Sequence, residues 1–457
     1  MIEKRLLQFR YLRYRELYME KVIVINLLFA LWYITGNSVI NLLFLAVLGM
    51  FIVTNTTVGD FYLFAGMIPF LKLVTYHGIT ILFVFQTVAM IKLVFEKRKL
   101  TISATSLFAA VLILATEFYF DYSYLSIGDF LYTICNFLYF ISFINWFRVE
   151  KIESRYLLSS VIITSGMCLL LVAIVAGQKG MSLANYANAS ENYIRLGTET
   201  TNLIGAMGIP TYAGIVLSCV YVLLIKYKLP VLEVILCIGI SLYSILLGFL
   251  SVSRGFILCL GVLIVLIVAN TLFTRNKKKS AIIILTMAVI IIFYYYNNSD
   301  SVINMFSKMQ SRMNGVNVTS NDNRSSIWKD CIKYLTSHPT AFLFGRGVNN
   351  YIAIGAKEGY RFSMSAHNLL LDGVMAWGCV GFGAFILSLC TFYKIMVRKG
   401  FGKVSFTYAI PFIVWFAMRM IGGAFTSFAM YMMILCFIII AASDKEKIFD
   451  YEDKSNG

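Results

Sequence analysis

The amino-acid sequence predicts an all-α polytopic membrane protein, and three observations carry this prediction. The chain of 457 residues is 59% hydrophobic and only 14% charged, whereas soluble domains carry about 25% charged residues. Its apolar residues fall in runs near the roughly 20 residues that cross a bilayer as a helix. The period-2 alternation of a membrane β-barrel is not seen. Because a span in lipid must satisfy its own backbone polar groups, the spans are expected to be helices.

The N-terminal residues 1–21 are predicted to form a cytoplasmic amphipathic segment. They are basic and lack the small-residue cleavage site of a secretory signal, so they are expected to lie on anionic lipid headgroups. The rest of the chain divides into transmembrane helices at 22–296 with an outer loop at 177–203, a large, partly helical extracytoplasmic loop at 297–365, C-terminal transmembrane helices at 366–442, and a cytoplasmic tail at 443–457.

The net charge of +16 gathers in loops that the positive-inside rule assigns to the cytoplasm. It does not indicate nucleic-acid binding, because no soluble basic domain is present. Alternating sides gives about 14 spans with both termini in the cytoplasm, and about 12 spans with a re-entrant or interfacial segment would also fit. The predicted spans are 22–36, 38–55, 60–76, 79–95, 102–119, 125–147, 156–176, 204–225, 230–250, 255–274, 280–296, 366–394, 405–420 and 424–442.

The sequence gives no sign of a metal or cofactor site. The nine cysteines are scattered singly, mostly within spans, and no C-x-x-C pair occurs. There is no Walker loop, no dinucleotide fingerprint, and no Asp-x-Asp in an outer segment. We therefore expect neither a metal nor a cofactor, and we interpret the cysteines as small apolar residues.

The loop at 297–365 is predicted to be folded and docked over the membrane domain, because a loop of this length is seldom a loose tether. Residues 321–335 are expected to form an amphipathic helix, with Asn321 or Asp322 as its cap and His338-Pro339 just beyond its end. The positions with helical spacing on its apolar stripe are Ile327, Trp328, Cys331, Ile332 and Leu335.

The three histidines, His77, His338 and His367, are the first candidates for a general base. Histidine is the side chain whose unperturbed pKa lies near neutral pH. His367 stands where the large loop re-enters the membrane. By position alone, however, a histidine there is more often a helix-start residue bonded to backbone groups.

Several arginines are predicted to share the outer face, against the usual depletion of basic residues on that side. A single arginine at a span end usually extends its charge to the headgroups. Several on one face indicate a site for an anion such as a lipid-linked phosphate or pyrophosphate. The acids Glu117, Asp121 and Asp129 would either pair with a nearby arginine or interface water, or bind sugar hydroxyls. The arginines are Arg195, Arg254, Arg324, Arg346 and Arg419.

Three local motifs then narrow the function. The first is Arg195-Leu196-Gly197 followed by Gly205 to Tyr212, and the second is Ser253-Arg254-Gly255 at the head of a span. In the third, order, spacing and position before a span all agree. It comprises Arg324-x-x-x-Trp328, His338-Pro339, Leu343-Phe344-Gly345-Arg346-Gly347, Asn350 and His367-Asn368.

These motifs resemble the bacterial O-antigen polymerase and O-antigen ligase superfamily, which includes capsular and exopolysaccharide polymerases. The resemblance covers roughly residues 180–400, with Ile209-Pro210-Thr211 in place of the family's Asn-Pro-Asn. It implies a GT-C-like, metal-independent glycosyltransferase of the cytoplasmic (inner) membrane. The donor would be a glycan on undecaprenyl pyrophosphate, bound at the extracytoplasmic face.

The resemblance also implies roles for individual residues. His367 would take the proton from the acceptor hydroxyl, as a general base. Arg195 and Arg254 would hold the pyrophosphate, and Arg254 would share in catalysis by stabilising the charge on the leaving group. The other residues expected to bind substrate are Arg324, Arg346, Arg419, Asn350 and Asn368.

The favoured activity is that of a polymerase, which transfers the glycan to a lipid-linked repeat-unit acceptor. A ligase that uses a different acceptor would need the same donor site. A lipid-linked glycan flippase or transporter is the second alternative, although no inverted repeat is apparent and Lys72 and Asp129 form no matched pair. The expected partners are the undecaprenyl-pyrophosphate-linked oligosaccharide, membrane lipids, and a chain-length regulator and flippase of the same pathway, without nucleic acid.

Overall fold

The computed structural model is helical, as predicted, apart from a two-stranded hairpin. It describes residues 2–70, 82–97, 103–121, 153–179, 208–251, 253–273, 324–362, 365–396, 406–422 and 428–442, with shorter pieces that include the hairpin and residues 137–141. Several predictions lie outside these residues: Lys72, His77, Asp129, Arg195, the caps Asn321 and Asp322, the side chains of Asp121 and Arg254, and most of the spans 125–147 and 280–296.

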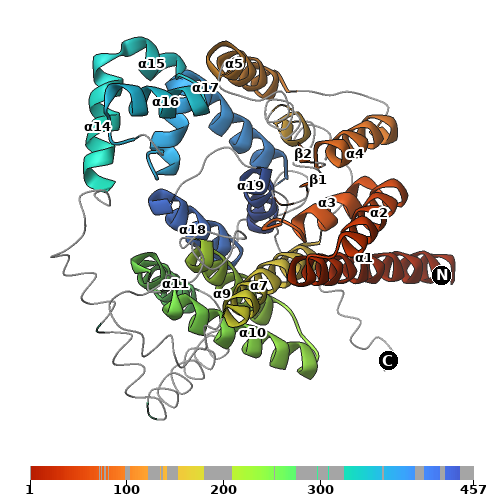
Figure 1. Ribbon diagram of the computed structural model, residues 1–457. Helices are drawn as coiled ribbons and strands as arrows, with labels where there is room; N and C mark the ends of the chain where they lie inside the picture. The colour runs from red at the N-terminus through yellow and green to blue at the C-terminus, as the bar shows by residue number, and fades with distance from the viewer. Residues whose placement is uncertain are drawn as a thin grey trace.

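The described elements follow the predicted order of spans closely (Figure 1). The first half comprises α1 (Ile2–Thr35), α2 (Ser38–Thr54), α3 (Thr57–Ala65), β1 (Thr75–Tyr76), β2 (Ile79–Thr80), α4 (Leu82–Lys97), α5 (Ala104–Asp121), α7 (Ser154–Gln178), α9 (Gly208–Lys226), α10 (Val231–Leu250) and α11 (Arg254–Phe273). The second half comprises α14 (Arg324–Ser337), α15 (Pro339–Phe344), α16 (Val348–Glu358), α17 (Leu369–Met396), α18 (Phe406–Gly422) and α19 (Phe428–Ala442).

The protein is a polytopic membrane protein. Among the described residues, five helices are long and apolar enough to cross a bilayer, in α1, α7, α9, α10 and α17, and shorter apolar helices accompany them. One face of α10 leaves Val231, Leu232, Ile235 and Leu236 more than half exposed. A contiguous apolar surface of this kind suits contact with lipid.

One predicted span, residues 60–76, is wrong. Helix α3 ends at Ala65, and turns follow as far as Phe70. A Cβ at Gly66 would collide with Val22 of α1, so the chain passes close to α1 there. Pro69 cannot continue a helix, because its ring clashes with the carbonyl four residues earlier. At nine residues, α3 is too short to cross the roughly 30 Å hydrocarbon core.

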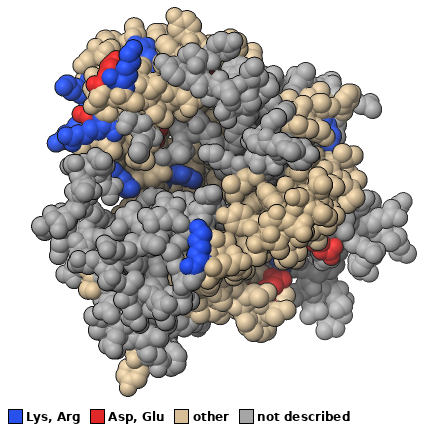
Figure 2. Space-filling model, in the orientation of Figure 1, with Lys and Arg blue, Asp and Glu red and all other residues tan. Residues whose placement is uncertain are grey.

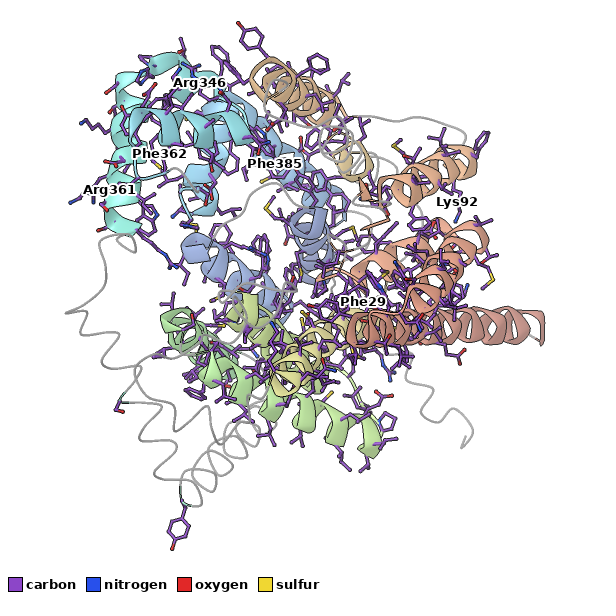
Figure 3. The ribbon with its side chains drawn as sticks, in the orientation of Figure 1. Phe29, Lys92, Arg346, Arg361, Phe362 and Phe385 are labelled. Atoms are coloured by element: carbon purple, nitrogen blue, oxygen red, sulfur yellow. The ribbon has the colours of Figure 1, made fainter. Side chains whose placement is uncertain are left out.

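The sequence also failed to reveal an ion pair among the first four helices. Lys92 of α4 donates to Asp60 of α3 at 2.8 Å and to the carbonyl of Ile52. Asp60 is fully buried, and Lys92 lies near the edge of this helix group (Figure 3). Lys21 of α1 donates to Asn55 close by. These polar contacts join four helices whose other contacts are largely apolar.

Helices α14, α15 and α16 form the upper left of Figure 1, where they lie over one end of α17. As predicted, this part of the loop is folded and docked. The predicted span 366–394, however, is not one regular helix, because Gly378 within α17 has φ 67° and ψ 173°. Such a break frees carbonyls on its N-terminal side, which then need other donors.

The loop supplies those donors. The backbone N–H of Arg346 donates to the carbonyl of Met375 at 3.0 Å, and that of Gly347 donates to Ala376 at 2.8 Å. Gly345 has φ 76°, and a Cβ on it would collide with the carbonyl of Ala376. A Cβ on Gly378 would likewise collide with the carbonyl of Leu343. The turn 345–347 and the kink 375–378 therefore form a latch, in which two glycines let the backbones touch.

A buried carboxylate strengthens the latch from α5. Glu117 accepts a hydrogen bond from Trp377 Nε1 at 2.7 Å, next to the kink, and a longer one from the N–H of Val348 at 3.5 Å. Glu117 and Trp377 are both almost completely buried. These two contacts are neither the pairing nor the sugar binding that the sequence suggested for this acid; they stabilise the packing around the kink.

Candidate functional site

Helix α14 covers the point where the loop re-enters the membrane. Its described residues are Arg324–Ser337, against the predicted 321–335, and it stops just before His338-Pro339, as predicted. The predicted stripe is wrong at Ile332, which is 52% exposed, while Tyr334 is buried in its place. The other buried positions on this helix are Ile327, Cys331 and Leu335.

One hydrogen bond ties α14 directly to the re-entry point. Trp328 Nε1 donates to the carbonyl of Ala366 at 3.0 Å. Arg324 lies one turn before Trp328 on the same side of the helix, which brings it toward this point.

Burial raises the pKa of Cys331 to about 12, helped by the nearby Asp372 and Asp330. Cys331 is therefore an unreactive thiol in the packing beneath α14.

His338 has a structural environment. Its Nδ1 donates to the carbonyl of Tyr334 at 3.0 Å, and the two rings stack with centroids 4.3 Å apart. Phe362, fully buried beside α14, closes the same aromatic group (Figure 3). These contacts hold His338 at the corner between α14 and α15, so the structure gives it a packing role.

His367 adopts an unusual backbone conformation. Its φ is 51°, in the left-handed region, and that of Ser365 is 146°. The Oγ of Ser365 accepts from the N–H of His367 at 3.1 Å and lies 3.3 Å from its Nδ1. A non-glycine residue with such a φ costs about 1–3 kcal/mol, and such residues cluster at functional sites.

Asn368 links the turn at His367 to α17 and α18. Its Oδ1 accepts from the N–H groups of Leu370 and Leu371 at 3.0 and 3.2 Å, which caps the start of α17. Its Nδ2 donates to the carbonyl of Met420 in α18 at 3.1 Å. The side chain that was predicted to bind substrate therefore caps α17 and ties it to α18.

Asp372 lies in the first turn of α17, and its carboxylate also stabilises the backbone turn that carries His367. Its Oδ1 accepts from the hydroxyl of Tyr351 and from the N–H of Ala366, each at 2.7 Å. Burial, followed by the neighbouring carboxylate of Asp372, raises the pKa of Tyr351 well above its usual range, so its hydroxyl is the donor. The Oδ2 of Asp372 is buried and has no hydrogen-bond partner within the described ranges.

The sequence reasoning missed both Tyr351 and Asp372. One signal was available, because an acidic residue inside an apolar run is costly and usually has a purpose. Tyr351 carried no such signal, since its partner lies 21 positions away along the chain.

Arg419 is the predicted arginine that the structure ties most directly to this turn. It precedes Met420, whose carbonyl accepts from Asn368. Its Nε is buried without a hydrogen-bond partner in the described part of the chain. The electrostatic interaction of Arg419 with Tyr212 places its charge beside α9. A cation in this setting favours an anionic ligand.

Three other predicted site residues lie outside the turn at His367. Arg346 donates from its guanidinium to Thr340 at 2.9 Å and lies over the Phe120 ring, at the outer corner formed by α15 and α5 (Figure 3). Asn350 precedes Tyr351 on α16 and is partly buried. Arg254 is the first residue of α11, where helix N–H groups favour an anion.

The charge distribution agrees with an anion site. In Figure 2, many of the described basic side chains visible on this face lie over α14 to α16, and others lie in a hollow beside these helices. Among the described residues, no group of three or more His, Cys, Asp or Glu side chains could hold a metal ion. Independence from metals stays a prediction.

Comparison with known proteins gives one match. Residues 239–386 match the family model described as O-antigen ligase. The resemblance is therefore confirmed over a segment that contains the second and third motifs, including Arg254, Arg324 and His367. Arg195 and Arg419 lie outside the matched segment. No curated protein matches the chain.

Proposed function

We propose, from the premise that residues 239–386 match the O-antigen ligase family model, that this membrane protein transfers a glycan from a lipid-linked pyrophosphate to an acceptor hydroxyl. The observation that carries the proposal is the turn at His367. This residue is held in a left-handed conformation between α14, α16, α17 and α18. A strained residue maintained by so many contacts is typical of a reacting group.

In the proposed reaction, the imidazole of His367 accepts the proton of the acceptor hydroxyl. The acceptor oxygen forms a bond to the anomeric carbon of the donor glycan, and the bond from that carbon to the pyrophosphate oxygen breaks. The lipid pyrophosphate leaves with the electron pair. His367 then returns its proton to solvent. General base catalysis of this kind contributes about 10²- to 10⁴-fold.

Arginines would bind the pyrophosphate and stabilise the charge that develops on it. Arg419 is supported by its buried Nε, which lacks a partner in the described ranges. Arg254 is supported by its place at the start of α11. We assign Arg195, Arg324, Arg346, Asn350 and Asn368 to substrate binding or to the support of this site. The only support for the role of Arg195 is the sequence motif in which it lies.

We further propose that the site faces the extracytoplasmic side and that both termini are cytoplasmic. This follows from the distribution of basic loops along the sequence. We retain the division into parts at 1–21, 22–296, 297–365, 366–442 and 443–457. Helix α1 runs without a break across the first of these boundaries, so the interfacial segment and the first span would be one helix.

Polymerase is our preferred activity, with a lipid-linked repeat unit as the acceptor. Ligase is the second candidate, favoured because the matched family is described as O-antigen ligase. The test is a reconstituted assay in EDTA with undecaprenyl-pyrophosphate repeat units as the only substrate. A ladder of products supports the polymerase. Donor consumption that starts only when a second acceptor is added supports the ligase, and intact donor in both cases contradicts the transferase.

The role of Arg419 gives a separate prediction. Arg419→Gln should raise the KM for donor about 10- to 100-fold, because it removes a charged donor of hydrogen bonds to an anion. The matched control is Arg361→Gln, since Arg361 is an exposed arginine at the outer edge of the loop (Figure 3). Its KM should equal that of wild type. Equal KM values for the two variants would exclude Arg419 from the donor site.

A further inference from the structure

The carboxylate of Asp372 is hydrogen-bonded directly to the turn that carries His367. It lies five residues after His367 and is 1% exposed. Oδ1 accepts from the N–H of Ala366, the residue just before His367, and from the hydroxyl of Tyr351. The second oxygen is buried with no hydrogen-bond partner in the described ranges. Asp372 is also in electrostatic range of His367.

A buried carboxylate that bonds only two neutral donors carries a desolvation cost, because its charge is removed from water. An asparagine oxygen could accept the same two bonds without the cost of burying a charge. What asparagine would lack is the negative charge next to His367. That charge favours the protonated imidazole, the form that arises when His367 accepts a proton.

We infer that Asp372 is a positioning residue for His367, which fixes the backbone of the turn through Ala366 and stabilises the imidazolium formed during transfer. The inference rests on the proposed function. It adds a residue that neither the motifs nor the matched family description names. The proton that His367 accepts does not pass to Asp372 before His367 returns it to solvent, so Asp372 remains ionised, as the aspartate of a serine protease triad does.

Other charged or titratable groups around this turn come from each neighbouring helix. Tyr351 of α16 keeps its proton and donates to Asp372. Cys331 of α14 remains a neutral thiol, and Asp330 accepts from the N–H of Arg361 at the surface. Arg419 of α18 is the cation next to Met420, whose carbonyl accepts from Asn368. In the described part of the site, Asp372 is thus the buried negative charge next to His367.

Glu117 provides a matched control. It too is a buried carboxylate that accepts bonds from an aromatic side chain, Trp377, and from a backbone N–H, that of Val348. Trp377 lies ten residues beyond His367, about 15 Å along a helix. Glu117→Gln therefore disturbs the docking of the same loop without removing a charge beside His367.

The experiment measures kcat and KM against pH for wild type, Asp372→Asn, Asp372→Glu and Glu117→Gln, each reconstituted at equal amounts of folded protein. Asp372→Asn should lower kcat about 10-fold with little change in KM. The base must be unprotonated to act, and loss of the nearby negative charge makes protonation harder. The acid limb of the profile should therefore move about one unit to lower pH.

Asp372→Glu retains the charge and should leave the acid limb at the wild-type pH. Glu117→Gln should lower the unfolding temperature and also leave the acid limb in place. An unshifted profile for Asp372→Asn, or an equal shift for Glu117→Gln, would overturn the inference. If His367→Ala keeps wild-type activity, the proposed function itself fails. If His367→Ala is inactive while Asp372→Asn behaves as wild type, only the inference about Asp372 fails.

Discussion

His367→Gln should reduce the rate of glycan transfer by about 10²- to 10⁴-fold, the range that a general base contributes. Glutamine retains much of the size and polarity of histidine but has no basic nitrogen. The substitution therefore removes proton transfer while keeping hydrogen bonding to Ser365 available. Donor binding should change little, because the arginines and not His367 are assigned to the pyrophosphate. Single-turnover consumption of labelled donor at saturating concentration measures this directly.

His338→Gln is the control for that experiment. His338 lies in the same loop, but it stacks on Tyr334 and bonds to a backbone carbonyl. Its replacement should leave the rate within a few-fold of wild type, with a small loss of stability. Similar losses from the two variants would show that the loop needs intact histidines for folding and would remove His367 from the chemistry.

Gly378→Ala should undock the loop and abolish activity. The added Cβ would collide with the carbonyl of Leu343, and a backbone atom cannot move aside by changing rotamer. The backbone conformation at Gly378, φ 67° and ψ 173°, is essentially restricted to glycine and adds about 1–3 kcal/mol for a residue with a Cβ. Together these costs should break the bonds from Arg346 and Gly347 to α17. Limited proteolysis within residues 324–362 should become much faster, and the unfolding temperature should fall.

Gly383→Ala, in the same helix, is the matched control. A Cβ there meets nothing within 4 Å, and its φ is not positive. Because alanine favours a helix over glycine by about 0.5–1 kcal/mol, this variant should be as stable as wild type or slightly more so. A Gly378→Ala protein with normal activity and a protected loop would refute the latch.

Much of the fold could be predicted from the sequence because membrane spans are recognisable by their length and apolar composition. The predictions for 156–176 and 230–250 differ from α7 and α10 only by a few residues at the ends. The span 60–76 was wrong because α3 stops where Gly66 packs against α1. That is a long-range contact that an apolar run does not reveal.

The candidate site was predictable in part. The position of His367 before a span, and its motif, were sufficient to select it. The contacts that support it join residues far apart in the chain, such as Trp328 with Ala366, and Asn368 with Met420. Ile332 was expected on the buried stripe, yet the apolar spacing could not tell on which side of α14 the re-entry segment would pack.

The latch has a consequence for exchanging loops between related proteins. The turn 345–347 and the kink 375–378 lie on opposite sides of the re-entry point at 366 along the chain, yet they bond to and pack against each other. A chimera joined at the edge of the membrane would bring in a foreign turn and keep the native kink, leaving the carbonyls of Met375 and Ala376 without donors. A graft that carries both segments together, from residue 324 through residue 378, would transfer the outer loop as a working unit.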